Sequence, residues 1–331
     1  MQNPIISYLE THLGKDTWKE LGQHLRYLAE DFWFDGPWNP LLQKRPATFD
    51  GPVATATVAA AASPTKTKTD TQAATKPKNT TSWHAQPGEI SEKMWGEGEV
   101  APLDLFLYDK LIIPLALNSN MSVLDMSAGL GGRMRRTTEE LGVYFTGLEP
   151  DPEIAKRGME LSVRAGKGKK APIEHYDPSH LKVSRTYDCV IARETFYRVP
   201  DQVACLQAIG KCTKPRAQIV FTDYILNPED REKPAIKTWL SSEKGANPFS
   251  LIEMAEAWAK VGFNIRISED LTDIYKAEIA NGMKRLLVFL SQGAKPDEET
   301  KVALAKRIDT WNRRTAAMEQ GMKFFRFYGT K

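Results

Sequence analysis

The chain has 331 residues, about twice the ~150 residues of a typical domain, so it can hold one large domain with attachments or two smaller units. Its 41% hydrophobic and 26% charged residues are typical of a globular protein and exclude a mostly disordered, fibrous or membrane-embedded chain. The formal net charge of +3 is too small to mark a dedicated nucleic-acid binder.

The three cysteines are Cys189, Cys205 and Cys212, an odd number at spacings that match no disulfide framework and no zinc motif. A reducing compartment is therefore expected. The first residues lack the basic and apolar regions of a signal peptide, and the longest apolar runs fall short of the ~18 residues that span a bilayer. We predict a cytoplasmic protein without a membrane span.

The first 82 residues differ in composition from the rest. The run Thr17-Trp18-Lys19-Glu20 is a capping-box pattern, and apolar residues follow it at helical spacing. Residues 52–82 are largely Ala, Thr, Lys and Pro without an aromatic residue, a composition that cannot offset its ordering entropy. We predict a small helical segment over residues 1–51, which packs on the main domain or binds a protein partner, a flexible linker over 52–82, and the main domain over 83–331.

Beyond Trp83, strand-like and helix-like segments alternate, which indicates an α/β fold of the doubly wound, Rossmann-like type with helices on both faces of one sheet. Strands are predicted at Ser122–Met126, Tyr144–Glu149, Tyr187–Ala192, Gln218–Tyr224, Asn264–Ser268 and Lys323–Thr330. Helices are predicted at Leu103–Leu117, Gly132–Leu141, Pro152–Ala165, Asp201–Cys212, Ser250–Val261 and Glu298–Gln320.

The first of these strands carries Asp125 near its end and runs into a glycine-rich turn that contains Gly129 and Gly131. Such a turn brings backbone close to a ligand, either a dinucleotide pyrophosphate or S-adenosylmethionine. The dinucleotide fingerprint G-x-G-x-x-G would need glycine where Met134 stands, so the sulfonium cofactor fits better.

Two further acids follow predicted strands. Glu149 lies twenty residues after Gly129, where a carboxylate can accept hydrogen bonds from both ribose hydroxyls. Asp177 follows a plausible third strand, where it could bond the adenine amino group. A strand-end carboxylate is more often a helix cap or turn residue, so the weight of this pattern lies in the combination with Asp125.

From about Trp95 to its C-terminus the sequence resembles the class I S-adenosylmethionine-dependent methyltransferases. The resemblance implies a seven-stranded sheet whose last strand, here Lys323–Thr330, runs antiparallel. The family motif is D-x-G-x-G-x-G, and Ser127 replaces its first glycine. The residues that would then hold the cofactor are Asp125, Ser127, Gly129, Gly131, Glu149 and Asp177.

Within that class, the chain is similar to the phosphoethanolamine and glycine-betaine-type N-methyltransferases in the runs Trp95-Gly96-Glu97-Gly98, Gly129-Leu130-Gly131-Gly132, Phe221-Thr222-Asp223-Tyr224 and Phe327-Tyr328-Gly329-Thr330-Lys331. The resemblance places Glu194 at the amine-holding aspartate. Pro87 and Arg198 stand about where the catalytic tyrosine and histidine are expected. Because arginine stays protonated, that catalytic pair cannot operate here.

The remaining catalytic candidates are Glu194, Tyr197 and Tyr224, which follow strands at the edge where open α/β sheets bind ligands. Taken singly, each is more typical of a structural hydrogen bond. Arg193 and Arg198 could clamp an anionic group of the substrate, or could form surface salt bridges.

Two further patterns suggest no special role. The five histidines show no metal-ligand spacing, so no metal site is predicted. The basic residues of the last helix, Arg314 among them, are typical of a solvated face.

The sequence therefore favours an S-adenosylmethionine-dependent methyltransferase that acts at nitrogen or oxygen of a small molecule. The alternative is a methyltransferase-like scaffold that has lost turnover, which Ser127, Pro87 and Arg198 motivate. Methylation of a macromolecule recruited by the N-terminal segment is a third hypothesis. The low net charge and the lack of the N/D-P-P-Y type motif of base-modifying enzymes argue against nucleic acid.

Overall fold

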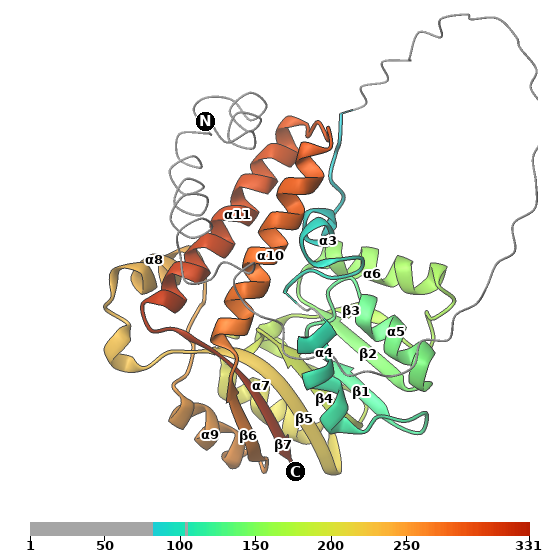
Figure 1. The fold of residues 1–331 in the computed structure, drawn as a ribbon. Helices are drawn as coiled ribbons and strands as arrows, with labels where there is room; N and C mark the ends of the chain where they lie inside the picture. Colours follow the sequence, from blue (N-terminus) through green and yellow to red (C-terminus); the bar gives the residue numbers. More distant parts are fainter. Residues whose placement is uncertain (1–81, 103–104) are drawn as a thin grey trace, which may run out of the picture. The chain divides into compact units, whose positions relative to one another are not determined.

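The structure is a computed structural model that describes residues 82–102 and 105–331 (Figure 1). Residues 83–331 form one compact unit. The predicted helix within residues 1–51, its protein partner and nearly all of the predicted linker lie outside the described residues. Among the described residues, none of the helices is both long and apolar enough to cross a membrane.

One seven-stranded sheet forms the centre, in the order β3-β2-β1-β4-β5-β7-β6. The first five strands pair in parallel, and β7 pairs antiparallel with both β5 and β6. This confirms the predicted sheet and its antiparallel last strand. The strands are β1 (Ser122–Asp125), β2 (Tyr144–Glu149), β3 (Ile173–His175), β4 (Tyr187–Arg193), β5 (Thr213–Ile225), β6 (Asn264–Asp270) and β7 (Lys323–Thr330).

Side-chain alternation along the central strands divides the core into two layers. Leu124 and Val190 face a cluster that includes α7 and α9. The next residues, Asp125 and Ile191, face α4. Helices thus cover both faces of the sheet, as predicted (Figure 1). The helices are α3 (Glu89–Trp95), α4 (Leu105–Ile112), α5 (Gly132–Leu141), α6 (Pro152–Arg164), α7 (Gln202–Lys211), α8 (Pro234–Ser242), α9 (Leu251–Lys260), α10 (Thr272–Ser291) and α11 (Glu298–Glu319).

Two long helices, α10 and α11, pack side by side in the connection between β6 and β7 (Figure 1). The helix α3 packs against α10, and α8 packs against α11. At the first contact a Cβ on Gly282 would lie 1.8 Å from the Trp95 ring, so only glycine lets these helices approach so closely. The helix pair α10–α11 places residues from the end of the chain beside the sheet edge that carries the predicted site.

The sequence did not predict α3, α8 or α10. The buried stripe of α10 includes Thr272, Glu278 and Gly282, which dilute its apolar periodicity. The strand β5 begins five residues before the predicted Gln218, because its first part pairs with β4 before a register shift and carries exposed residues.

Candidate active site

The glycine-rich turn after β1 is fixed by the side chain of Asp125. Its Oδ1 accepts hydrogen bonds from the backbone N–H of Ser127 at 2.9 Å and from the Ser127 hydroxyl at 2.8 Å. Gly129 and Gly131 adopt φ values of 55° and 74°, the left-handed region that favours glycine. The turn ends at Gly132, where α5 begins.

Ser127, which replaces the family's first glycine, joins the ends of β1 and β4. Its hydroxyl accepts a hydrogen bond from the backbone N–H of Arg193 at 2.9 Å. The Arg193 guanidinium donates to the Ser127 carbonyl at 2.7 Å and lies 3.5 Å from Glu99. The serine side chain is therefore held by β4, and Arg193 is committed to supporting the turn, although both residues border the cleft described below.

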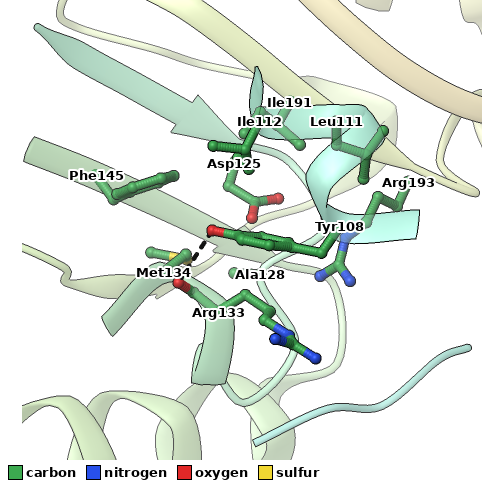
Figure 2. Close-up of a pocket in the computed structure, with 10 residues that line it drawn as sticks. All are labelled: Tyr108, Leu111, Ile112, Asp125, Ala128, Arg133, Met134, Phe145, Ile191 and Arg193. Atoms are coloured by element: carbon green, nitrogen blue, oxygen red, sulfur yellow. Dashed lines mark hydrogen bonds between the residues drawn. The ribbon is translucent and has the colours of Figure 1, made fainter. Parts of the chain in front are cut away.

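Asp125 faces a small cavity of about 10 Å³ rather than the large cleft. Figure 2 shows this cavity with Asp125, Tyr108, Arg133 and Arg193 around it, and the Tyr108 hydroxyl donates to the Arg133 carbonyl at 3.4 Å. Such a volume is sufficient for about one water molecule. Asp125 therefore acts on the cleft through Ser127 and the turn.

Glu149 ends β2 and lies under the turn. Its two carboxylate oxygens accept hydrogen bonds from the backbone N–H groups of Gly129 at 2.9 Å and Asp151 at 3.0 Å. Burial raises the pKa of Glu149 to about 7, against the lowering effect of these two bonds. Since a carboxylate offers about four acceptor sites, Glu149 can accept two further hydrogen bonds from a ligand.

Residues 83–101, which we call the strap, cross from α10–α11 to the glycine-rich turn. Trp83 pairs through its backbone with Lys295 at 2.7 Å and Asp297 at 3.0 Å. At the other end the Gly98 carbonyl accepts from the Gly132 N–H at 3.1 Å, and Glu99 accepts from the Arg133 N–H at 3.1 Å. The strap therefore occupies the first N–H groups of α5, where an anion would otherwise bind.

A cleft of about 940 Å³ lies between the strap, the ends of β2 and β4, and α11. A volume of this size is typical of small-molecule sites. Of the predicted site residues, those that line the cleft are Ser127, Glu149, Arg193, Glu194 and Arg198. Pro87 lines it as well. The two residues that stand where the similar enzymes are expected to have their catalytic tyrosine and histidine, Pro87 and Arg198, therefore border one cleft.

Asp177, the predicted adenine contact, is not among the lining residues, although its neighbours Tyr176 and Pro178 are. Its carboxylate accepts from the Ser179 N–H at 2.8 Å and pairs with His180 at 2.9 Å. The side chain is 57% exposed. The adenine contact therefore stays a prediction.

Glu194 directly follows β4 and is buried at the edge of the cleft. Its backbone has a φ of 50°, a left-handed conformation that costs a non-glycine residue about 1–2 kcal/mol and that clusters at functional sites. Its carboxylate accepts from the hydroxyls of Tyr224 at 3.3 Å and Tyr275 at 2.5 Å. The structure thus brings together the predicted pair Glu194 and Tyr224.

Arg314 of α11 completes this group. It donates to Glu194 at 2.8 Å and to the Tyr197 hydroxyl at 2.8 Å, and it contacts both oxygens of Glu243. The Tyr197 hydroxyl in turn donates to Glu243 at 2.7 Å and accepts from Arg198. Burial acts to raise the pKa of Glu243, but the charge and hydrogen bonds of Arg314 outweigh it and lower that pKa to about 2.

The expectation that Arg314 lies on a solvated face is wrong, since Arg314 is 3% exposed. Sequence reasoning also missed Tyr275, Glu243 and Asp223. Asp223 accepts from the N–H groups of Phe196 at 2.7 Å and Tyr224 at 2.8 Å, which ties β5 to the turn after β4. The signal for Asp223 was its position two residues before the end of a buried strand.

The buried tyrosines are hydrogen-bond donors rather than bases. Burial raises the pKa values of Tyr197, Tyr224 and Tyr275 well above the usual value, so all three phenols stay protonated at neutral pH. Among residues 82–102 and 105–331, no group of His, Cys, Asp or Glu is placed to bind a metal ion.

A family model described as a methyltransferase domain matches residues 104–267. Phosphoethanolamine N-methyltransferase 3 of Arabidopsis thaliana is 24% identical over 215 residues, which cover 63% of this chain and 43% of that protein. Cycloartenol-C-24-methyltransferase 1 of Oryza sativa subsp. japonica is 31% identical over 169 residues, 49% of each chain. The chain thus spans about half the length of the curated relatives that it matches.

Among solved structures, phosphoethanolamine N-methyltransferase 2 of Haemonchus contortus, in complex with phosphomonomethylethanolamine and S-adenosylhomocysteine, superposes with a TM-score of 0.64. The match has 17% sequence identity and covers 73% of this chain and 56% of that one. At this identity the likeness supports the fold.

Proposed function

The described chain carries a class I methyltransferase domain whose cofactor is S-adenosylmethionine and which resembles the phosphoethanolamine N-methyltransferases, and from this premise we propose that the protein methylates a small molecule in the cleft. One observation supports the proposal above all. Glu149 at the glycine-rich turn and Glu194 after β4 border the same cleft, so a cofactor held by one and an acceptor held by the other would lie in one cleft.

The cofactor side is compatible with the residues present. Glu149 keeps two acceptor sites for the ribose hydroxyls, and the turn beside it packs so closely that a Cβ on Gly131 would lie 2.5 Å from the Ile173 side chain. A Cβ on Gly129 would lie 2.6 Å from Val100 of the strap. We propose that Glu149 holds the ribose, that the turn built on Asp125 and Ser127 holds the amino-acid part, and that Asp177 would need to turn from His180 to reach the adenine.

When bound, the cofactor supplies an electrophilic methyl group, whose carbon–sulfur bonding pair stays with sulfur while a lone pair of the acceptor forms the new bond. The protein's part is to orient the acceptor and exclude water. We propose that Glu194 and Arg198 contact the acceptor and that Tyr224 holds Glu194 as a neutral donor. Tyr197 donates to Glu243 and accepts from Arg314, so it would position Glu194 only through Arg314. Arg193 would support the turn rather than clamp the substrate.

The compartment proposed for the protein is the reducing cytoplasm. All three cysteines are buried and unpaired, and burial raises the pKa of each thiol to about 11 or 12, which keeps it unreactive. In an oxidising compartment, cysteines are typically paired in disulfides, whereas these three thiols are unpaired.

Calorimetric titration of S-adenosylhomocysteine into the full chain tests the cofactor site. We expect Glu149→Ala to weaken binding at least about tenfold, because the buried hydroxyl contacts lose their acceptor. Glu174→Ala removes an exposed carboxylate of neighbouring β3 and serves as the matched control. No binding by the full chain, or equal losses in both variants, would contradict the proposed pocket.

Turnover is tested separately, by incubating the protein with methyl-labelled S-adenosylmethionine and a fractionated extract of small metabolites. Label transferred to a small molecule supports the enzyme. Cofactor binding without transfer to any fraction would favour the alternative of a scaffold without turnover.

A further inference from the structure

We propose that the methyl acceptor binds as an anion, through a carboxylate or phosphate group, and brings no ammonium group to Glu194, because Arg314 already takes the place of such a cation. This inference rests on the proposed function and adds the chemical class of the acceptor. It concerns the part of the cleft between the end of β4 and α11.

The first observation is the ion pair of Glu194. Arg314 donates to its Oε2 at 2.8 Å. The Glu194 side chain is 7% exposed and the Arg314 side chain 4%. Tyr275 and Tyr224 donate to the same carboxylate. The negative charge that would attract an ammonium group is therefore compensated within the protein itself.

The second observation is the aromatic surroundings of Arg314. Its guanidinium carbon lies 4.5 Å from the ring centre of Trp311 and 5.5 Å from that of Tyr224. Aromatic faces next to a carboxylate are the surroundings in which an alkylammonium ligand is held. Here the guanidinium occupies them, and a second cation would meet its charge at short range.

The third observation is the balance of charges around this pair. The guanidinium groups of Arg198 and Arg314 pair with the carboxylates of Glu194 and Glu243, whereas Arg307 adds a third positive charge without an ion pair. At the neighbouring end of β2, the carboxylate of Asp151 accepts hydrogen bonds from two backbone N–H groups, and its charge acts on Arg307 without forming an ion pair with it.

Arg307 is the guanidinium of this group that stays available to a ligand. It lines the cleft from α11 and is half-buried, and within residues 82–102 and 105–331 its side chain has no hydrogen-bond or ion-pair partner. Burial and the charges of Arg314 and Arg198 lower the pKa of Arg307, which records the cost of placing it there. Lys244, Lys306 and the acidic Glu299 also line the cleft, and an anion bound at Arg307 would give this guanidinium the partner that it lacks.

The experiment uses four probes of similar size that differ in the charge of the head group: benzoate, phenyl phosphate, benzyl alcohol and benzylammonium. Each is titrated by calorimetry into the full chain saturated with S-adenosylhomocysteine. We expect benzoate or phenyl phosphate to bind at least about tenfold more tightly than benzyl alcohol and benzylammonium. The stronger of the two anions identifies the head group as carboxylate or phosphate.

Arg307→Gln should weaken the preferred anion about tenfold or more, and Arg307→Lys less, since lysine keeps the charge but loses the planar fork. Arg313→Gln is the matched control, because Arg313 lies on the same helix, pairs with Asp309 at 2.7 Å and does not line the cleft. The pair Arg314→Met with Glu243→Gln removes one charge of each sign and should improve benzylammonium binding by freeing Glu194.

Benzylammonium binding as tightly as the anions, no binding of either anion, or equal losses in the Arg307 and Arg313 variants would overturn the inference. Saturation with S-adenosylhomocysteine is verified first. Failure at that step counts against the proposed function, whereas failure of the anion preference after it counts against this inference alone.

Discussion

Glu149 accepts hydrogen bonds from ribose hydroxyls more strongly when it is ionised, because protonation turns one of its acceptor positions into a donor, and burial raises its pKa to about 7. We therefore expect the dissociation constant of S-adenosylhomocysteine to fall about tenfold as the pH rises from about 6 to about 8, because the ionised fraction of Glu149 rises by that factor. Calorimetry or a fluorescence titration across this range measures it.

The matched control is Glu149→Gln, which cannot ionise and should bind weakly with a flat pH profile. Glu99 and Asp223 also have a pKa of about 7 through burial, so the difference between the two proteins isolates Glu149.

Folding stability depends on pH in the opposite direction to cofactor binding. A folded pKa raised above 4.5 means that protonated Glu149 favours the folded state, a contribution present below about pH 4.5 and lost as the pH rises through about 7. An equal pH dependence of the dissociation constant in Glu149→Gln and in the unsubstituted chain would refute the role of Glu149 as the titrating acceptor.

Single residues differ in how far the sequence reveals them. Glu149 could be predicted, since it ends the strand β2 twenty residues after Gly129. The two strands that pair with β2, β1 and β3, are also its neighbours in the sequence. Arg314 could not, because its partner Glu194 lies 120 residues away and a helix with many charged residues gives no sign that one of them is buried. Ser127 could be recognised as a departure, but only the fold reveals that β4 holds its hydroxyl.

Among the elements, the strap depends on close backbone contact with the start of α5. A Cβ on Gly98 would lie 2.5 Å from the Cα of Gly132, whereas a Cβ on Gly96 would meet nothing within 4 Å. Both glycines have positive φ values, 77° and 102°, so alanine is strained at each. The steric clash distinguishes them.

We expect Gly98→Ala to be less stable than Gly96→Ala by about 1–3 kcal/mol, because the clash must lift the strap from the N-terminus of α5. It should also weaken S-adenosylhomocysteine binding, since Val100 would move away from Gly129. Urea unfolding and calorimetry measure the two effects. Equal stability of the two variants would mean that the strap is not fixed by this contact.

At the scale of the whole molecule, the alternation of strands and helices was enough to predict the sheet and its class. The site was less predictable, because one side of the cleft is formed by elements far apart in the sequence, the strap and α11, and α11 lies in the connection between β6 and β7. Apolar periodicity reports which face of an element is buried and carries no information on which distant element covers it.

The start of the strap defines where the folded unit begins, and two truncations can locate it. Trp83 pairs with Lys295 and Asp297 through its backbone, and its ring packs on Phe289 with centres 5.0 Å apart. A chain of residues 83–331 keeps these contacts, and we expect it to match the full chain in melting temperature and S-adenosylhomocysteine affinity.

A chain of residues 88–331 loses the contacts of Trp83, together with the pair between His84 and Asp297. Its melting temperature should fall by roughly 5 °C or more, from the loss of an aromatic contact and two backbone hydrogen bonds. If the longer fragment is already destabilised, residues 1–82 contribute to the fold and the boundary at Trp83 is wrong.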